Sequence, residues 1–299
     1  MTCDLCGAAG GGQPVLEGGD RRFGLPGRFA VVQCPSCGLV RTEPQPQDPG
    51  TYYPAAEYYS YAAPQASPLT RAAVASRYGG RAGALARLAG RRISALPPGP
   101  PGDLLDVGCG SGAMLLALEA AGWRGHGVEL DEGAVGAAHE AGLARVRAGD
   151  LLDAAYEPGS FDAVRFSHSL EHMRSPRAEL AEARRTLRPG GRLAVAVPDF
   201  GALLRRTFGE RWFFLDLPRH LWHFDRRTLP RLVRESGFEV TRVRNVTASS
   251  AILGTIDYLR GRRETLTTNA AAWYAAQPLA AVLDLLRLGD ELEVIAVAR

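Results

Sequence analysis

The stretch that decides the fold class is Leu104-Leu105-Asp106-Val107-Gly108-Cys109-Gly110-Ser111-Gly112. Its first four residues predict a short buried strand, and the three alternating glycines predict a tight turn that a ligand can approach closely. A helix is predicted next, at residues 113–121, and the free N–H groups of its N-terminus favour ligand binding at the same place. We therefore expect a strand, a ligand-binding turn and a helix.

Strand and helix patterns alternate on both sides of this turn. Further strands are predicted at residues 126–130, 145–148, 161–166 and 192–197. Helices are predicted at residues 67–96, 133–141, 176–187 and 228–236. Such alternation is typical of parallel strands joined by crossover helices, and so of a doubly wound α/β sheet.

The last part of the chain departs from that alternation. Two more strands are predicted, at residues 238–243 and 291–297, and a long insertion at 245–289 separates them. The insertion is expected to include a helix near residues 280–288.

Three acidic residues lie at or near the carboxyl ends of three consecutive predicted strands. Asp106 lies just before the glycine turn, Glu129 ends the second strand, and Asp150 comes after the third. Because open α/β sheets bind ligands at the carboxyl ends of their strands, we expect these carboxylates to meet at one site.

With these features, residues 100–245 and the last strand resemble the class I S-adenosylmethionine-dependent methyltransferases. The matching motifs, in order, are DVGCGSG (106–112), GVELD (127–131), AGDLLD (148–153), FDAV (161–164) and LRPGGRLAVAVP (187–198). The resemblance implies a Rossmann-like, seven-stranded, doubly wound sheet that ends in an antiparallel C-terminal hairpin.

The resemblance also implies a role for each residue of the cofactor site. The turn around Gly110 would line the methionine portion, Glu129 would bind the ribose hydroxyls, and Asp150 would meet the adenine amine. Asp106 would support the ammonium group, and Ser167 and His168 would contact the cofactor through backbone atoms. The full predicted set is Asp106, Gly108, Cys109, Gly110, Gly112, Glu129, Leu130, Asp150, Leu151, Ser167 and His168.

Two alternatives for the turn stay open. A nicotinamide-binding Rossmann enzyme would show G-x-G-x-x-G, whereas this chain has glycine at 108, 110 and 112 followed by Ala113. A glycine turn in a non-binding α/β domain is the other alternative. Carboxylates beside the turn suit a sulfonium and an ammonium better than a pyrophosphate, which favours adenosylmethionine.

Four of the five cysteines form two equal pairs near the N-terminus. The pairs are Cys3-x-x-Cys6 and Cys34-x-x-Cys37, and glycine follows each of them. Two such turns supply four thiolates for a tetrahedral structural zinc ion with no open coordination position. Two disulfides or four unrelated thiols are the alternatives, which a reducing compartment disfavours. We expect a small zinc-ribbon-like module, with strand material around residues 29–32.

Composition then divides the chain into three parts. Residues 1–45 form the zinc-binding module, residues 46–98 a Tyr/Pro-rich linker and helical segment, and residues 99–299 the adenosylmethionine-binding domain, with insertions at 200–227 and 245–289. The linker contains five tyrosines that either line an acceptor pocket or pin a surface segment: Tyr52, Tyr53, Tyr58, Tyr59 and Tyr61.

Two segments supply candidates for handling a methyl acceptor. Glu171 and His172 follow the fourth strand, where related methyltransferases often have the same pair. Residues 218–224 read PRHLWHF, which resembles a stretch found in methyltransferases acting on sugars, quinones and natural products. We expect one histidine of this set, His172, His220 or His223, to act as a general base.

Structural roles for the same residues are alternatives that the sequence leaves open. His172 would then cap a helix, and residues 212–224 would form a loop packed on the sheet. A metal site built on His220 and His223 lacks an obvious third ligand beyond Asp216.

Charge and hydropathy exclude several classes of protein. The net charge is +3 in 299 residues, and all 35 basic residues are arginine, which argues against a protein that mainly coats nucleic acid. No apolar run of about 18 residues occurs and no secretory signal opens the chain, so we expect a cytoplasmic protein without membrane spans.

The sequence therefore predicts an enzyme that transfers methyl groups from S-adenosylmethionine to a small acceptor. The acceptor would be a sugar, a polyketide or another secondary metabolite, methylated at carbon or oxygen. The cysteine module ahead of this domain resembles that of nucleotide-sugar C-methyltransferases, which carry a further C-terminal domain that we do not expect here. An RNA methyltransferase with a zinc finger and a non-catalytic binding protein are the alternatives. Nothing in the sequence predicts the oligomeric state.

Overall fold

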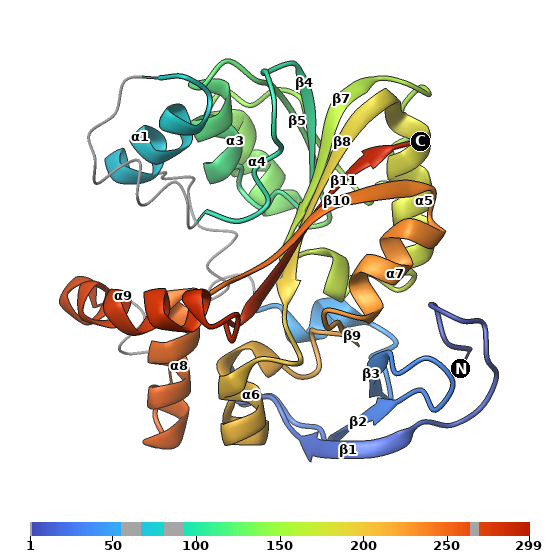
Figure 1. Ribbon diagram of the computed structural model, residues 1–299, viewed down its shortest axis with the longest axis vertical. Coiled ribbons are helices and arrows are strands. Elements are labelled where there is room, and N and C mark those ends of the chain that lie inside the picture. Colours follow the sequence, from blue (N-terminus) through green and yellow to red (C-terminus); the bar gives the residue numbers. More distant parts are fainter. Residues whose placement is uncertain (1, 55–66, 81–92, 264–268) are drawn as a thin grey trace.

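A computed structural model describes residues 2–54, 67–80, 93–263 and 269–299, and its centre is one seven-stranded sheet (Figure 1). The strand order is β10-β11-β8-β7-β4-β5-β6, in which β8, β7, β4, β5 and β6 run parallel while β11 pairs antiparallel with β8 and with β10. The strands are β4 (Asp103–Val107), β5 (Arg124–Glu129), β6 (Val146–Ala148), β7 (Phe161–Ser167), β8 (Leu187–Pro198), β10 (Phe238–Val246) and β11 (Glu291–Ala298). This order confirms the predicted doubly wound sheet with an antiparallel C-terminal hairpin.

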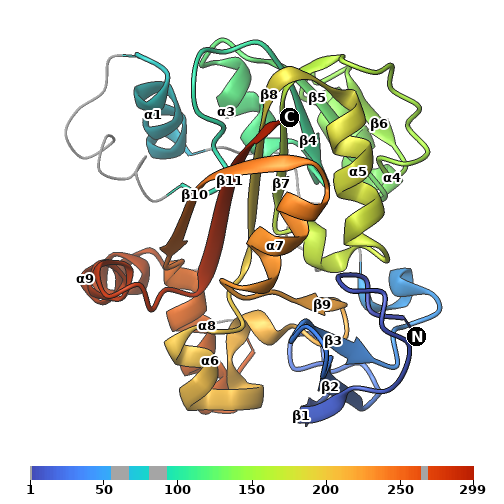
Figure 2. The same ribbon diagram turned by 45° about the vertical axis from the view of Figure 1, so that its right-hand side comes forward.

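Helices cover both faces of this sheet (Figures 1 and 2). One face carries α1 (Pro68–Arg77), α3 (Ala113–Glu119) and α4 (Glu132–Glu140), and the other carries α5 (Pro176–Thr186) and α7 (Thr228–Glu235). Polar side chains start two of them: Asp131 accepts from the amide of Ala134 at 2.7 Å, and Ser175 accepts from that of Ala178 at 3.3 Å. These caps satisfy amide groups that a helix N-terminus leaves unpaired.

A second sheet of four strands lies below the carboxyl ends of the parallel strands (Figure 2). Its order is β1 (Gln13–Gly18), β2 (Phe29–Gln33), β3 (Val40–Glu43) and β9 (Trp222–His223). The strand expected around residues 29–32 is therefore confirmed as β2. The fourth strand comes from the insertion at 200–227, so the N-terminal module and the methyltransferase-like domain share one sheet.

The hydrophobic core is also shared. The main buried cluster contains Val107 and Val195 of the large sheet together with Cys3, Leu5 and Leu39 of the N-terminal module. Each of these side chains is at most 3% exposed. Apolar burial on this scale is the main stabilising term in folding, so the two parts stabilise each other.

Three expectations about element bounds need correction. The helix expected at 67–96 ends at Arg77 in α1, and residues 81–92 lie outside the described part of the chain. Strand β8 begins at Leu187 and passes through the glycines at 190 and 191, with an irregular register against β7, rather than starting at residue 192.

The insertion at 245–289 holds two helices instead of the single short one expected. These are α8 (Ser249–Leu259) and α9 (Ala270–Leu285), which pack on each other through residues such as Ile252 and Ala280. Helical periodicity did not reveal the full length of α9 because its apolar residues lie on buried and exposed sides alike: Leu283 is 4% exposed and Leu285 is 82% exposed. No helix among the described residues combines the length and the apolar character needed to span a membrane.

Short elements complete the site region between β8 and α7. They are α6 (Leu203–Phe208) and the 3-10 helices η4 (Gly209–Arg211) and η5 (Phe213–Leu215). Two further 3-10 helices are η1 (Pro49–Tyr52) and η3 (Leu170–His172).

Candidate active site

The glycine turn after β4 has the backbone shape that the sequence predicted. Gly108, Gly110 and Gly112 have φ angles of 72°, 56° and 85°, which residues with a Cβ atom rarely adopt. A Cβ atom on Gly108 would lie 2.6 Å from Cβ of Ser169, and one on Gly112 would lie 2.3 Å from Leu143. Glycine is therefore required here both by conformation and by space.

Glu129 at the end of β5 braces this turn. Its Oε2 accepts a hydrogen bond from the Gly110 amide at 2.8 Å, and its Oε1 accepts from the Asp131 amide at 3.1 Å. Each carboxylate oxygen keeps a further lone pair, so the group retains the capacity to accept from the hydroxyls of a ribose.

Asp106 offers an acceptor with no protein partner. Its Oδ2 binds Arg165 at 2.6 Å, while its buried Oδ1 receives no hydrogen bond from the described residues. Burial raises the pKa of Asp106, and the neighbouring Arg165 opposes that rise. An orphaned carboxylate oxygen beside the glycine turn fits the ammonium group of adenosylmethionine.

The other predicted cofactor residues differ in how far they are exposed. Asp150 is half-buried and its Oδ1 accepts from the Asp153 amide at 2.8 Å, while Leu130 is 73% exposed next to the turn, as a wall for an adenine ring would be. Leu151 is fully buried. Cys109 is half-buried, and its sulfur would lie 2.6 Å from a Cβ atom placed on Gly127.

Ser167 and His168 lie where β7 ends. Ser167 is half-buried, and the His168 amide donates to the Ala196 carbonyl at 2.8 Å. The His168 side chain turns away from the glycine turn toward two glutamates: its Nε2 lies 3.1 Å from Glu291 and its Nδ1 3.5 Å from Glu171. Burial lowers the pKa of His168, but these carboxylates raise it well above the ordinary value, which makes the ring an imidazolium at neutral pH.

The four N-terminal cysteines converge on one point. The Sγ atoms of Cys3 and Cys37 lie 3.5 Å apart, those of Cys6 and Cys34 lie 3.7 Å apart, and all four fall within 4.8 Å of one another as free thiols. The two turns have the same hydrogen bonds: Gly7 donates to Cys3 O at 2.8 Å, and Gly38 donates to Cys34 O at 2.9 Å. This arrangement suits the tetrahedral four-sulfur coordination of zinc.

The candidate acceptor residues form a buried cluster of Glu171, His172 and His220. One ligand atom from each lies within 4.8 Å of the others, and Nε2 of His220 is 3.9 Å from Oε1 of Glu171. Glu171 and His172 belong to η3, whereas His220 precedes β9. The structure therefore joins two of the predicted segments into one polar site.

Both histidines of this cluster are anchored through Nδ1. His220 Nδ1 lies 2.9 Å from the Phe214 carbonyl, and His172 Nδ1 lies 3.0 Å from the Arg219 carbonyl. Burial lowers the pKa of His220 to about 4 and also lowers that of His172. At neutral pH both rings are therefore neutral, and a ring that donates from Nδ1 leaves the Nε2 lone pair available.

His223 takes a different position, in β9. Its Nε2 lies 3.0 Å from Oγ1 of Thr42, and that hydroxyl donates to the His220 carbonyl at 2.6 Å. Because the Thr42 proton is engaged, His223 donates to the threonine oxygen. Its predicted role as a base stays a prediction, and its contacts tie the N-terminal sheet to the histidine loop.

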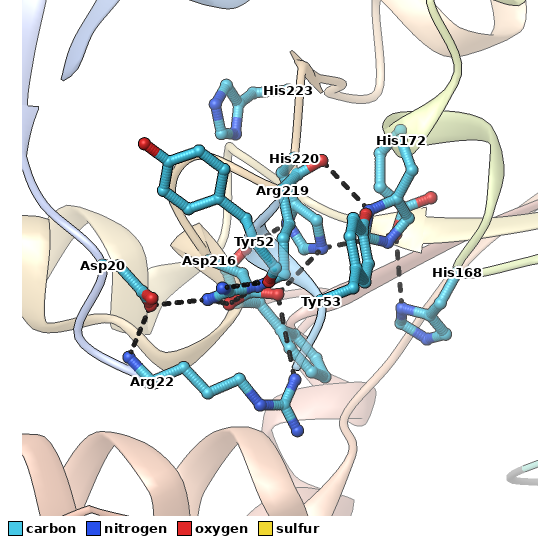
Figure 3. Close-up of polar contacts among 12 residues, drawn as sticks. Asp20, Arg22, Tyr52, Tyr53, His168, His172, Asp216, Arg219, His220 and His223 are labelled. Carbon is cyan, nitrogen blue, oxygen red and sulfur yellow. Dashed lines mark hydrogen bonds and ion pairs between the residues drawn. The ribbon is translucent and has the colours of Figure 1, made fainter. Parts of the chain in front are cut away.

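The N-terminal module reaches the cluster through Asp20 and Arg22, which sequence reasoning missed (Figure 3). Arg219 binds Asp216 at 2.5 Å and Asp20 at 2.8 Å, with the Arg219 and Asp20 side chains fully buried. Arg22 lies 3.8 Å from Asp216, and Tyr53 Oη lies 2.7 Å from His172 Nδ1. The only signal for these partners was the tyrosine group, of which Tyr58, Tyr59 and Tyr61 lie outside the described residues.

The comparison with protein families agrees with this geometry. A family model described as a methyltransferase domain matches residues 81–243, more than half of the 299-residue chain. The fold and the site define the class of S-adenosylmethionine-dependent methyltransferases. The chain belongs to the methyltransferase domain family.

Curated relatives match parts of the chain. It is 29% identical over 173 residues to ubiquinone biosynthesis O-methyltransferase of Aromatoleum aromaticum, covering 53% of this chain and 68% of that protein. Nocamycin O-methyltransferase of Saccharothrix syringae is 41% identical over 120 residues, which are 37% of this chain and 43% of the relative. An uncharacterized 37.1 kDa protein in transposon TN4556 of Streptomyces fradiae is 36% identical over 37% of this chain and 34% of its own length. The last two matches thus span less than half of the relatives.

Two solved structures are similar at lower identity. A possible histamine N-methyltransferase from Thermotoga maritima has a TM-score of 0.48 and 19% identity, covering 67% of this chain and 83% of that chain. The [4+2]-cyclase SpnF has a TM-score of 0.47 and 25% identity, covering 71% of this chain and 78% of that chain.

Proposed function

We propose that this protein transfers a methyl group from S-adenosylmethionine to a small-molecule acceptor at carbon or oxygen. The observation that carries the proposal is the adjacency of two sites at one edge of the sheet. The glycine turn with Asp106, Glu129 and Asp150 would hold the cofactor, and the buried cluster of Glu171 and His220 would meet the acceptor.

The residues of the turn suit adenosylmethionine by charge and by shape. Asp106 would receive the ammonium group through its orphaned Oδ1, and Glu129 would receive the ribose hydroxyls. When bound, this cofactor supplies an electrophilic methyl group on sulfur. The protein then has mainly to orient the acceptor in line with that methyl group.

The acceptor would be activated at His220. A hydroxyl or an acidic C–H must lose its proton as the new bond to the methyl carbon forms, and a lone pair positioned nearby promotes that loss. His220 is neutral, buried and anchored at Phe214, so its Nε2 lone pair is directed rather than free to rotate. The position supports His220 for this role ahead of His223.

The chemical class of acceptor is also a proposal. The relatives named above carry the names of O-methyltransferases for ubiquinone biosynthesis and for nocamycin, which favours a hydroxyl on a small natural product. Four cysteines at a common point support a structural zinc ion as a second component of the protein.

Labelled methyl transfer onto phenols, quinols and nucleotide sugars tests the proposal. We expect transfer to at least one class, and we expect His220→Ala to abolish it while calorimetry shows unchanged cofactor affinity. His139→Gln is the matched control, since His139 lies on α4 and its side chain contacts the Val146 carbonyl of β6. An absence of adenosylmethionine binding, or full turnover in His220→Ala, would overturn the proposal.

A further inference from the structure

We propose that Glu171, His172 and His220 bind a divalent transition-metal ion, at a site distinct from the four cysteines. The proposed methyl transfer gives this metal its role, but the site itself is inferred from the geometry of the three side chains. Two imidazoles and one carboxylate are ligands that suit zinc, manganese, iron or cobalt better than magnesium or calcium.

The three ligands come together from two separate segments. Their ligand atoms lie within 4.8 Å of one another, and the His220 Nε2 to Glu171 Oε1 distance is 3.9 Å. Metal bonds of about 2.0–2.2 Å would draw such atoms to roughly 3 Å from one another. Small side-chain rotations are therefore enough to close the site around an ion.

Glu171 shows most clearly that a partner is missing. The side chain is 1% exposed, and neither carboxylate oxygen accepts a hydrogen bond from any residue that the structure describes. The His168 ring lies 3.5 Å away, at ion-pair distance. Buried carboxylates are normally hydrogen-bonded, paired or bound to metal, and a single ion pair leaves one oxygen of Glu171 without any of these.

The two histidines are arranged as metal ligands usually are. Each has its Nδ1 against a backbone carbonyl, Phe214 for His220 and Arg219 for His172, and the Nδ1 of His172 also lies 2.7 Å from Tyr53 Oη. Metal-binding histidines commonly donate one ring N–H to such a carbonyl, which fixes the ring and directs the other nitrogen at the ion. His168, paired with Glu171, would orient the carboxylate ligand in the same way.

The surrounding charge also favours a cation. Among the residues that the structure describes, the ion pairs linked to the cluster contain four carboxylates and three cations: Asp20, Glu171, Asp216 and Glu291 against Arg22, His168 and Arg219. One of these carboxylates, that of Asp216, lies 3.9 Å from Nε2 of His220. A bound dication would therefore meet a local excess of negative charge.

A metal at this position would activate the acceptor. Three protein ligands leave coordination positions open, as catalytic sites require. An acceptor hydroxyl bound there would lose its proton to water more readily, because the ion stabilises the oxyanion. The oxygen would then form its bond to the methyl carbon as the carbon–sulfur bond breaks. With the ion bound, the lone pair of His220 would hold the metal instead of taking the proton itself.

Cobalt titration of the zinc-loaded protein tests the site. We expect one Co²⁺ ion per chain beyond the metal on the cysteines, with an absorption spectrum that lacks thiolate charge transfer. Glu171→Gln and His220→Gln should each weaken this binding by at least tenfold. His223→Gln, a change of the same kind on a histidine outside the cluster, should leave it unchanged.

The design separates failure of the site from failure to fold and from failure of the proposed function. Glu171→Asp keeps a carboxylate and should keep part of the binding that Glu171→Gln loses, with far-UV circular dichroism recorded for both. No extra Co²⁺ in the wild type, or equal binding in Glu171→Gln, would overturn the metal site even if methyl transfer proceeds. Metal binding without adenosylmethionine binding would instead overturn the proposed function.

Discussion

Asp106 and Glu129, two residues of the predicted cofactor site, differ in what their carboxylates contact. Asp106 leaves one oxygen open to a ligand, whereas Glu129 also holds the turn through the Gly110 amide. Asp106 was predicted from its place before the turn and Glu129 from its place after a strand. The hydrogen bond that joins Glu129 to the turn depends on the parallel pairing of β4 with β5.

Glu129→Ala should weaken adenosylmethionine binding roughly ten- to a hundredfold. The substitution would remove the charged hydrogen bonds that we propose to the ribose, each worth about 1.5–3 kcal/mol, and it leaves the Gly110 amide without its acceptor. Isothermal calorimetry measures the change. Glu132→Ala, on an exposed position of α4 three residues later, is the control and should bind as the wild type does. Equal affinity in both variants would contradict the assignment of Glu129.

Asp290 gives a pH-dependent prediction at the same scale. Burial raises its pKa from 3.8 to about 7, and Trp212 donates to its Oδ1 at 2.7 Å. The folded state therefore favours the neutral acid, and the stability that the group contributes is present below pH 3.8 and is lost as the pH rises toward 7.

Asp290→Asn should accordingly raise the melting temperature at pH 8 more than at pH 5. The amide oxygen can still accept from Trp212, and it carries no charge to bury at either pH. Thermal unfolding at the two pH values measures the difference. A shift of the same size at both values would show that the carboxyl does not titrate in this range.

At the scale of elements, the two-residue strand β9 has the largest effect on the site. It pairs Val40 with His223 and Arg41 with Trp222, and the Thr42 amide donates to the Leu221 carbonyl at 3.0 Å. A strand this short has no periodicity that a sequence pattern could reveal. The pairing nevertheless sets where His220 lies, because His220 is only two residues before the first residue of β9.

Thr42→Val should lower both stability and turnover. The side chain is fully buried, and its hydroxyl donates to the His220 carbonyl and accepts from the His223 ring. Losing these contacts should lower the free energy of unfolding by about 1–3 kcal/mol. Turnover should fall while cofactor affinity stays the same, since the glycine turn is not involved. Thr207→Val, on the exposed side of α6, is the control. Unchanged turnover in Thr42→Val would show that the acceptor site does not depend on this contact with the N-terminal sheet.

At the scale of the whole molecule, the cysteine module is part of the main core. Cys3 and Cys34 belong to the same buried cluster as Val107 and Val195. Arg177 of α5 also donates to the backbone oxygen of Asp4 at 2.8 Å, between the first two cysteines. Loss of order in the module would therefore expose part of the large domain.

Removing the zinc ion that we propose on the four cysteines should destabilise the whole chain. Structural zinc contributes directly to folding free energy, and here the folding of the module is coupled to the main core. We expect Cys34→Ser to lower the melting temperature of a single unfolding transition and to abolish stoichiometric zinc. Cys109→Ala, which lies in the glycine turn, should keep the zinc. An unchanged transition in Cys34→Ser would mean that the module unfolds independently.

Much of the fold and the cofactor site was predictable from the sequence because their signals are local. The glycines at 108–112, the acidic residues that end strands and the paired cysteines each carry their chemistry within a few positions. The seven strands alternate with helices in a pattern that short-range periodicity reveals. Helices α8 and α9 lacked such a pattern, and the sequence showed only part of them.

Only the tertiary structure decided how the acceptor site is composed. His220 and His223 were both predicted as candidate bases from the same stretch of sequence, yet His220 lies with Glu171 and His172, and His223 lies with Thr42. Glu171 and His220 are 49 positions apart, and Asp20 lies 199 positions from Arg219. These contacts result from a loop that joins the N-terminal sheet and from burial in a shared core. The sequence alone determined which chemical groups the protein has, and packing over long separations decided which of them meet.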